Sequence, residues 1–359
     1  MLQYLQMCRG LAALAVCLFH ASGIFNDPRF GSHPVLADYT RLGYVGVDFF
    51  FALSGFIILF AHQADINRPS ALKAYALKRF IRIYPLYWVV YVCILVLAFA
   101  SGGESTPPST FGDTATSTLL LKFTSYSSPV HPAWTLFHEV LFYLLFALSI
   151  WRKRVGTIAL IVWAAVLIFP AVLAPLPAIL KPLVALVTAP VNICFFGGMG
   201  AFLLYKRYGL VAGAVSSVLG FLFLVYVLAF LSPDWNLFMF KFLLACAFML
   251  FLSGISAVER VRGAIAMPLL TLIGNASFML YLTHENVQST AIKLLYYFGA
   301  YNSLDERIVF CIIMLASVGA GIVGYVLIEK PMLRWLRGRL MGRRGQAPLT
   351  PSPGMGSSR

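Results

Sequence analysis

Residues 43–62 read GYVGVDFFFALSGFIILFAH. A helix needs about 20 predominantly apolar residues to cross the hydrocarbon core of a bilayer, and this stretch has that length. One acid, Asp48, interrupts its apolar run. The stretch therefore predicts a transmembrane helix that carries a buried charge.

Similar apolar runs recur along the 359-residue chain, which is 60% hydrophobic and 11% charged, with a mean hydropathy of +0.84. Soluble domains are about 25% charged, so the composition excludes an ordinary soluble enzyme, a disordered chain and a nucleic-acid-binding domain. We expect an all-α, polytopic transmembrane bundle over residues 1–335 and a basic, then disordered, cytoplasmic tail over 336–359. The expected spans are about ten: residues 43–62 and the runs near 10–26, 84–101, 134–150, 155–175, 183–204, 209–231, 236–257, 265–284 and 308–329. We interpret the first run as an uncleaved helix and not as a signal peptide.

The net charge of +14 indicates topology. Lys and Arg are enriched in cytoplasmic loops, and a cytoplasmic N-terminus leaves 20 of the 27 basic residues inside. We therefore predict that both termini are cytoplasmic, and that residues 330–344, basic with interleaved Leu and Trp, form an interfacial helix on anionic lipid. The seven basic residues on the outer side are Arg29, Arg41, Lys122, Lys181, Lys241, Lys293 and Arg307.

The cysteines predict neither a disulfide nor a metal site, because all of them fall in or beside apolar runs and none forms a C-x-x-C pair. The six are Cys8, Cys17, Cys93, Cys194, Cys246 and Cys311.

Ionisable residues inside the expected spans are few, and such residues are usually functional. Arg9 and His20 are eleven residues apart, which places them on one face of the first helix, about 16 Å apart along its axis. Asp48 begins the second helix and Glu139 the fourth. His20, Asp48 and Glu139 should therefore reach similar depth in the outer half of the membrane. A histidine with carboxylates can perform general acid–base catalysis, although a proton relay uses the same groups.

Each of these residues also has a structural interpretation. His20 could be a buried histidine bonded to a neighbouring backbone, Arg9 a snorkelling anchor, and Asp48 one half of a helix–helix ion pair. Arg79 and Arg82 lie three residues apart at the cytoplasmic start of the third helix. If that segment is helical they share a face, and paired arginines suit phosphate, but each alone could be a topology anchor.

Several motifs in order carry a resemblance to a known family. They are Arg9 with His20, GVDFFFALSGF at 46–56, KRFIRIYP at 78–85, WTLFHEVLFY at 134–143, SFMLYLTH at 277–284 and EKP at 329–331. Over about residues 1–335 the chain resembles the acyltransferase-3 family of integral membrane acyltransferases, which includes bacterial O-antigen and exopolysaccharide O-acetyltransferases. The block at 134–143 is most similar to the exopolysaccharide-production subgroup. His138, beside Glu139, departs from the usual pattern.

The resemblance implies an O-acetyltransferase of the inner (plasma) membrane. Its donor substrate would be cytoplasmic acyl-CoA, usually acetyl-CoA, and its acceptor a hydroxyl of a cell-surface glycan or a lipid-linked precursor. It implies no permanently bound cofactor, and we expect no metal and no nucleic-acid partner. Membrane lipid and polysaccharide-biosynthesis proteins are candidate partners.

The resemblance also assigns residues. Arg9, Arg79 and Arg82 would hold the CoA phosphates, and we expect Arg82→Ala to weaken donor binding with little loss of folding. His20 would be the general base, oriented by Glu139 or Asp48, with an acyl-imidazole on His20 as an alternative. The pantetheine arm would pass the small residues Ser54, Gly55, Gly197 and Gly198. Candidate substrate-binding residues are His284, Trp134, His138 and Tyr281.

A second function is consistent with the same residues. A multi-pass transporter or flippase for a glycan or lipid, with a buried proton relay, also explains ten spans and buried acid–base groups. It does not explain the inner arginine cluster together with the ordered motifs.

Overall fold

The computed structural model describes residues 2–30, 35–101, 107–231 and 236–341, and within them it contains helices and no strand, which confirms the all-α prediction. Its helices are α1 (Gln3–Gly23), α2 (Ala37–Thr40), α3 (Val45–His62), α4 (Leu72–Ser101), α5 (Phe111–Leu119), α6 (Trp134–Trp151), α7 (Lys153–Ile168), α8 (Lys181–Thr188), α9 (Ile193–Tyr205), α10 (Leu210–Phe230), α11 (Leu237–Arg262), α12 (Pro268–Tyr297), α13 (Glu306–Gly324) and α14 (Lys330–Met341).

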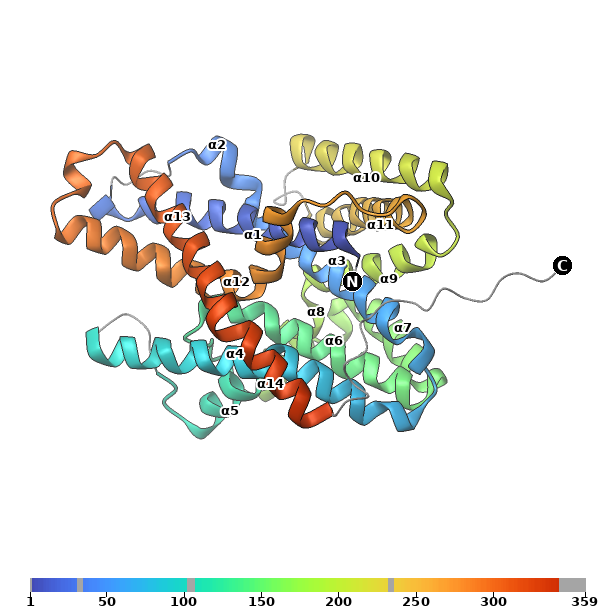
Figure 1. The fold of residues 1–359 in the computed structure, drawn as a ribbon. Coiled ribbons are helices and arrows are strands. Elements are labelled where there is room, and N and C mark those ends of the chain that lie inside the picture. Colours follow the sequence, from blue (N-terminus) through green and yellow to red (C-terminus); the bar gives the residue numbers. More distant parts are fainter. Residues whose placement is uncertain (1, 31–34, 102–106, 232–235, 342–359) are drawn as a thin grey trace.

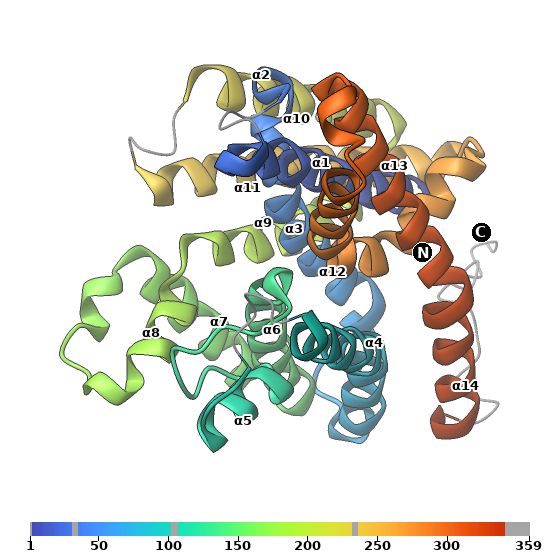
Figure 2. The same cartoon turned by 90° about the vertical axis from the view of Figure 1, so that its left-hand side faces the viewer.

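The helices form two groups joined by central elements. In both views α10 and α11 lie on the opposite side of the molecule from α4 and α5, with α3 and α9 between them (Figures 1 and 2). One π-helical turn, Tyr325–Glu329, joins α13 to α14. The long red segment that results packs against α12 through α13 and against α4 through α14 (Figure 1). The predicted tail beyond Met341 lies outside the described residues.

Seven helical segments of the described chain are long and apolar enough to cross a membrane, or eight if α8 and α9, bent by about 40°, form one broken span. The other two expected spans correspond to α7, which has 16 residues, and to α12. The count of ten and the cytoplasmic termini therefore remain predictions.

Helix α12 is long enough to cross a membrane, but polar side chains interrupt its apolar run, so it is not among the seven apolar segments. Its buried side chains include Ser277, His284 and Gln288. The helix also continues to Tyr297, whereas the hydrophobic run predicted an end near residue 284. This extension places Glu285 inside the helix.

Helices α1 and α12 cross at two glycines and run parallel. A Cβ on Gly274 would lie 1.9 Å from the carbonyl oxygen of Gln6, and one on Gly10 would lie 2.9 Å from the amide nitrogen of Gly274. Ten residues further along each helix, the rings of His20 and His284 meet with centroids 5.0 Å apart. Because the second contact is displaced in the same direction on both helices, α1 and α12 point the same way.

Helices α3 and α9 approach equally closely. A Cβ on Gly198 would lie 1.7 Å from the carbonyl oxygen of Ala52, and one on Gly55 would lie 2.1 Å from that of Phe195. Gly197 is in similar close contact with the backbone of α11. The expectation that these three glycines line a path for pantetheine is therefore wrong, because protein backbone already fills the space beside them.

Candidate functional site

A cavity of about 920 Å³, the basic cavity, opens between α1, α3, α4, α6, α12 and α14. Six cations and two carboxylates, Glu139 and Glu329, line it, which leaves an excess of four positive charges. An excess of one sign inside low-dielectric walls attracts an ion of the other sign. The six cations are Arg9, Lys78, Arg79, Arg82, Arg334 and Arg337.

The two arginines of the predicted pair lie on one helix, because α4 begins at Leu72, twelve residues before the apolar run. Nη2 of Arg79 lies 3.1 Å from Nε2 of His62, and its guanidinium lies 5.3 Å from the ring centre of Tyr143. Among the described residues, the buried Nε of Arg79 has no hydrogen-bond partner. Arg79 therefore lines the basic cavity and keeps one buried donor without a partner.

Arg82 is more constrained than Arg79. Its Nη1 donates to Oε1 of Glu329 at 3.0 Å, and Glu329 is only 1% exposed. Removing one partner of a buried ion pair typically costs about 3–5 kcal/mol. The sequence predicts little loss of folding in Arg82→Ala, but with this ion pair we expect the variant to destabilise the fold as well, so that it does not isolate donor binding.

Glu139 lies in the basic cavity. One of its carboxylate oxygens accepts hydrogen bonds from the hydroxyl of Tyr143 and from Oγ of Ser54, the latter at 3.3 Å. Arg9 lines the same cavity and lies on the same helix as His20, eleven residues earlier in the chain. The predicted placement of Arg9 and His20 at two levels of one helix therefore agrees with the structure, and the predicted grouping of Glu139 with His20 does not.

A smaller cavity of about 250 Å³, the histidine cavity, adjoins the basic cavity. Val47 and Tyr281 line both of them. These two side chains therefore lie where the cavities meet. Most of the residues predicted for chemistry or substrate binding line the histidine cavity: His20, Asp48, Trp134, Tyr281 and His284, together with Glu285.

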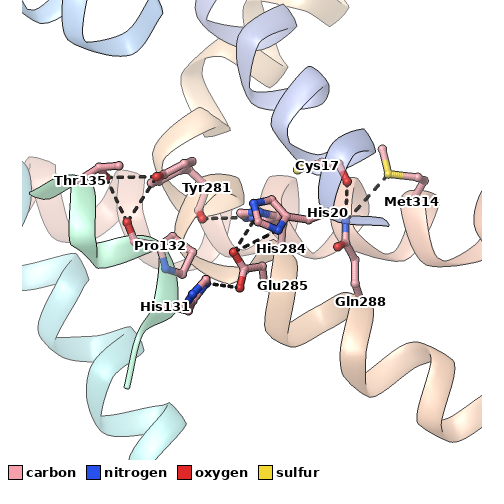
Figure 3. Close-up of polar contacts among 10 residues, drawn as sticks. All are labelled: Cys17, His20, His131, Pro132, Thr135, Tyr281, His284, Glu285, Gln288 and Met314. Atoms are coloured by element: carbon pink, nitrogen blue, oxygen red, sulfur yellow. Dashed lines mark hydrogen bonds and ion pairs between the residues drawn. The ribbon is translucent and has the colours of Figure 1, made fainter. Parts of the chain in front are cut away.

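Glu285 is the carboxylate beside His20 (Figure 3). Its Oε1 lies 3.4 Å from Nδ1 of His20, and its Oε2 lies 2.7 Å from Nδ1 of His131. The expectation that Glu139 or Asp48 orients His20 is therefore corrected, because α12 runs past residue 284 and its parallel packing on α1 places Glu285 against the imidazole.

Asp48 has its own partner. Its Oδ2 lies 2.7 Å from Nζ of Lys241, which joins α3 to α11, and Cys194 lies 3.9 Å from its Oδ1. Asp48 is 1% exposed, so the ion pair is almost fully desolvated. The structure thus agrees with the interpretation of Asp48 as half of a helix–helix ion pair, here in the wall of the histidine cavity.

Not all of the candidate substrate-binding residues line a cavity. Trp134 lines the histidine cavity, and the hydroxyl of Tyr281 donates to Oγ1 of Thr135 at 3.1 Å (Figure 3). His138 lines neither cavity, because it is buried and its Nδ1 lies 2.9 Å from the amide oxygen of Asn192. The structure gives His138 the geometry of a packing residue.

Sequence reasoning missed several residues of the two cavities. Glu285 directly follows a motif histidine, and the polar side chains after it at helical spacing were a sign that α12 continues. Lys241 is among the seven basic residues expected on the outer side, and the structure pairs it with the buried Asp48. Arg334 and Arg337 lie in the segment expected to bind lipid, and α14 also presents them to the basic cavity.

The fold and the site together define a class of protein: a polytopic membrane protein with a cationic cavity beside a histidine–carboxylate site. The chain belongs to the acyltransferase-3 family, since the model of that family, described as an acyltransferase domain, matches residues 2–326. The protein is therefore a membrane acyltransferase that transfers groups other than aminoacyl groups.

Curated relatives agree with this assignment. Acyltransferase MdmB of Streptomyces mycarofaciens is 26% identical over 96% of this chain and 94% of its own length. Exopolysaccharide production protein ExoZ of Rhizobium meliloti is 28% identical over 83% of this chain and 91% of its own length. Putative acetyltransferase ORF330 of Acidianus two-tailed virus is 28% identical over 65% and 67%. No solved structure matches the chain.

Proposed function

We propose that the protein is an O-acyltransferase of the inner (plasma) membrane. It takes an acyl group, in the first place acetyl, from cytoplasmic acyl-CoA and transfers it to a hydroxyl of a cell-surface glycan or of a lipid-linked glycan precursor. The name of the viral relative supports an acetyl group, and that of ExoZ supports a glycan acceptor and polysaccharide-biosynthesis proteins as partners.

The observation that carries the proposal is the adjacency of the two cavities at Val47 and Tyr281. Acyl-CoA has a pyrophosphate and a ribose phosphate at one end, and its thioester lies at the far end of a slender pantetheine arm. Arginines suit such phosphates because their planar donors match the oxygens in pairs. With the phosphates in the basic cavity, the arm extends past Tyr281 and presents the thioester to His20.

The reaction then follows from the histidine cavity. Nε2 of His20 accepts the proton of the acceptor hydroxyl, and the hydroxyl oxygen attacks the thioester carbonyl. The new C–O bond forms as the C–S bond breaks, and the CoA thiolate leaves and takes the proton from the His20 imidazolium. Glu285, beside Nδ1, orients the ring and stabilises the imidazolium. Positioned proton transfer of this kind contributes about 10²–10⁴-fold to a rate.

The acceptor hydroxyl would contact Trp134 and His284, which line the cavity together with His20. The Asp48–Lys241 pair closes another wall and joins α3 to α11. Asp48 thus supports the shape of the cavity, and Glu285 is the carboxylate that acts on the base.

The test uses the purified protein in proteoliposomes with acetyl-CoA and a lipid-linked glycan extract. We expect release of the free CoA thiol and appearance of acetyl ester on the glycan by mass spectrometry. Acetyl-dephospho-CoA, which lacks the ribose phosphate, is the matched donor and should show a higher KM with similar kcat. A carrier would move glycan across the bilayer and leave the thioester intact, which would contradict the proposal.

A further inference from the structure

We propose that His20, His284 and Glu285 bind a divalent transition-metal ion of the Zn²⁺ type. One ligand atom from each residue lies within 4.8 Å of the other two. Oε1 of Glu285 is 3.4 Å from Nδ1 of His20 and 3.9 Å from Nε2 of His284. Ligand atoms about 2.0–2.1 Å from a tetrahedral zinc ion lie roughly 3.3–3.4 Å from one another. The first spacing already fits, and the second needs a contraction of about half an ångström.

The protonation state of His284 points to a ligand at this place. The side chain is fully buried, and its Nδ1 lies 2.8 Å from the backbone carbonyl of Tyr281. A carbonyl only accepts, so Nδ1 must carry the proton and, in the neutral ring, Nε2 must carry the lone pair. Among the described residues this buried Nε2 has no hydrogen-bond partner, and it faces Glu285 and His20 (Figure 3).

The groups behind the ligands have the arrangement found in metal sites. Metal-ligating histidines usually donate their second N–H to a carbonyl or carboxylate, as His284 does to Tyr281. Ligating carboxylates are usually hydrogen-bonded in turn, as Glu285 is through Oε2 to His131. The histidine cavity leaves one side of the cluster open to a water or a substrate oxygen.

The ligand set also selects the ion. Two imidazoles with one carboxylate favour zinc, cobalt, nickel and copper over magnesium and calcium, which prefer all-oxygen sites. The prediction of no metal site rests on the cysteines, whereas the three proposed ligands are two histidines and one glutamate. The ligands come from α1 and α12, and the two histidines are 264 residues apart in the chain, so no local pattern reveals them.

Metal binding would switch off the proposed base, a consequence that rests on the proposed function. When Nδ1 of His20 coordinates a cation, the neutral ring carries its proton on Nε2. Nε2 then has no lone pair for the acceptor hydroxyl. Zn²⁺ should therefore inhibit acyl transfer, and a chelator should restore it.

The binding test uses the full chain without a histidine tag, purified in detergent, stripped with EDTA and dialysed. We expect titration with CoCl₂ to give the visible absorption of four-coordinate Co²⁺, displaced by Zn²⁺. His20→Asn, at a partly exposed side chain, and Glu285→Gln should each weaken Co²⁺ binding by more than the roughly 10–100-fold that loss of a hydrogen-bond partner behind a ligand costs. The matched control is His138→Gln, a buried histidine outside both cavities, which should bind Co²⁺ normally. Each variant must elute as folded protein in size-exclusion chromatography.

The outcomes separate the two proposals. No Co²⁺ band, or a band unchanged in folded His20→Asn, overturns the metal site whatever the activity. Co²⁺ binding in a protein that transfers no acyl group supports the metal site and contradicts the proposed function alone. Acceleration of acyl transfer by Zn²⁺ overturns the inhibitory role.

Discussion

The basic cavity and the histidine cavity differ in how the charged side chains that line them are partnered. The basic cavity keeps an excess of four positive charges, and three buried polar atoms without partners among the described residues line it: Nε of Arg79, Oγ of Ser277 and Oε2 of Glu329. In the histidine cavity each charged group has a close partner, Asp48 in Lys241 and Glu285 in the imidazoles of His20 and His131. Excess charge suits capture of an anion, and partnered groups suit proton transfer within a fixed geometry. Substitutions in the first cavity should therefore change the donor KM, and those in the second should change kcat.

The largest expected effect is that of His20→Gln. The side chain has similar volume but no base, so kcat should fall by about 10²–10⁴-fold with the donor KM unchanged. Release of CoA thiol in proteoliposomes measures both constants. A normal kcat in correctly inserted His20→Gln protein would mean that His20 is not the general base and that the histidine cavity does not determine kcat.

The next effect separates two carboxylates. Glu285→Gln keeps the shape of the side chain but removes the charge beside His20. A hydrogen bond to a charged group is worth about 1.5–3 kcal/mol, so kcat should fall roughly 10–100-fold. Glu139→Gln, the matched change in the basic cavity, should leave kcat closer to that of the wild type. The reverse order of the two variants would return the orienting role to Glu139.

The sequence predicted helices where apolar runs are long, and it predicted Arg9 and His20 at two levels of one helix. Both predictions agree with the structure, because hydropathy and helical spacing are local properties. The partners of His20 and Asp48 could not be predicted in this way. Glu285 and Lys241 reach them through packing between helices far apart in the chain, which no local pattern encodes.

The ends of helices were a second source of error. Helix α12 continues beyond its apolar run because its polar side chains face protein and not lipid, as buried Gln288 shows by donating to the carbonyl oxygen of Cys17 at 2.9 Å. Helix α4 begins twelve residues before its apolar run and continues through Pro85, a residue that usually ends or kinks a helix. Hydropathy marks where lipid begins, and helices can extend past that limit.

The third prediction tests the crossing of α1 and α12, two helices that line both cavities. In Gly274→Ala the added Cβ would lie 1.9 Å from the backbone oxygen of Gln6, so α12 must shift away from α1. Overpacking of this kind costs about 1–3 kcal/mol, and it should also separate His284 and Glu285 from His20. We expect a lower thermal midpoint in detergent together with a lower kcat.

Gly319→Ala on α13 is the matched control for this crossing, since nothing lies within 4 Å of the added Cβ. It should leave both the midpoint and kcat near the wild-type values. Equal effects of the two substitutions would mean that the loss reflects a general sensitivity of the bundle and not the contact between α1 and α12.

The smallest effect distinguishes a donor site from a lipid anchor. Arg337 lines the basic cavity, whereas Arg339, on the same helix, stacks 5.6 Å from the ring centre of Trp335 and lines neither cavity. Losing one charge-assisted contact to phosphate costs about 1.5 kcal/mol, so Arg337→Gln should raise the KM for acetyl-CoA roughly tenfold with kcat unchanged. Arg339→Gln should leave that KM unaltered, because both substitutions weaken lipid binding equally but only the first removes a cation from the cavity. If both variants raise the KM to the same extent, α14 acts through the membrane surface, and the arginines of α14 do not bind the donor in the basic cavity.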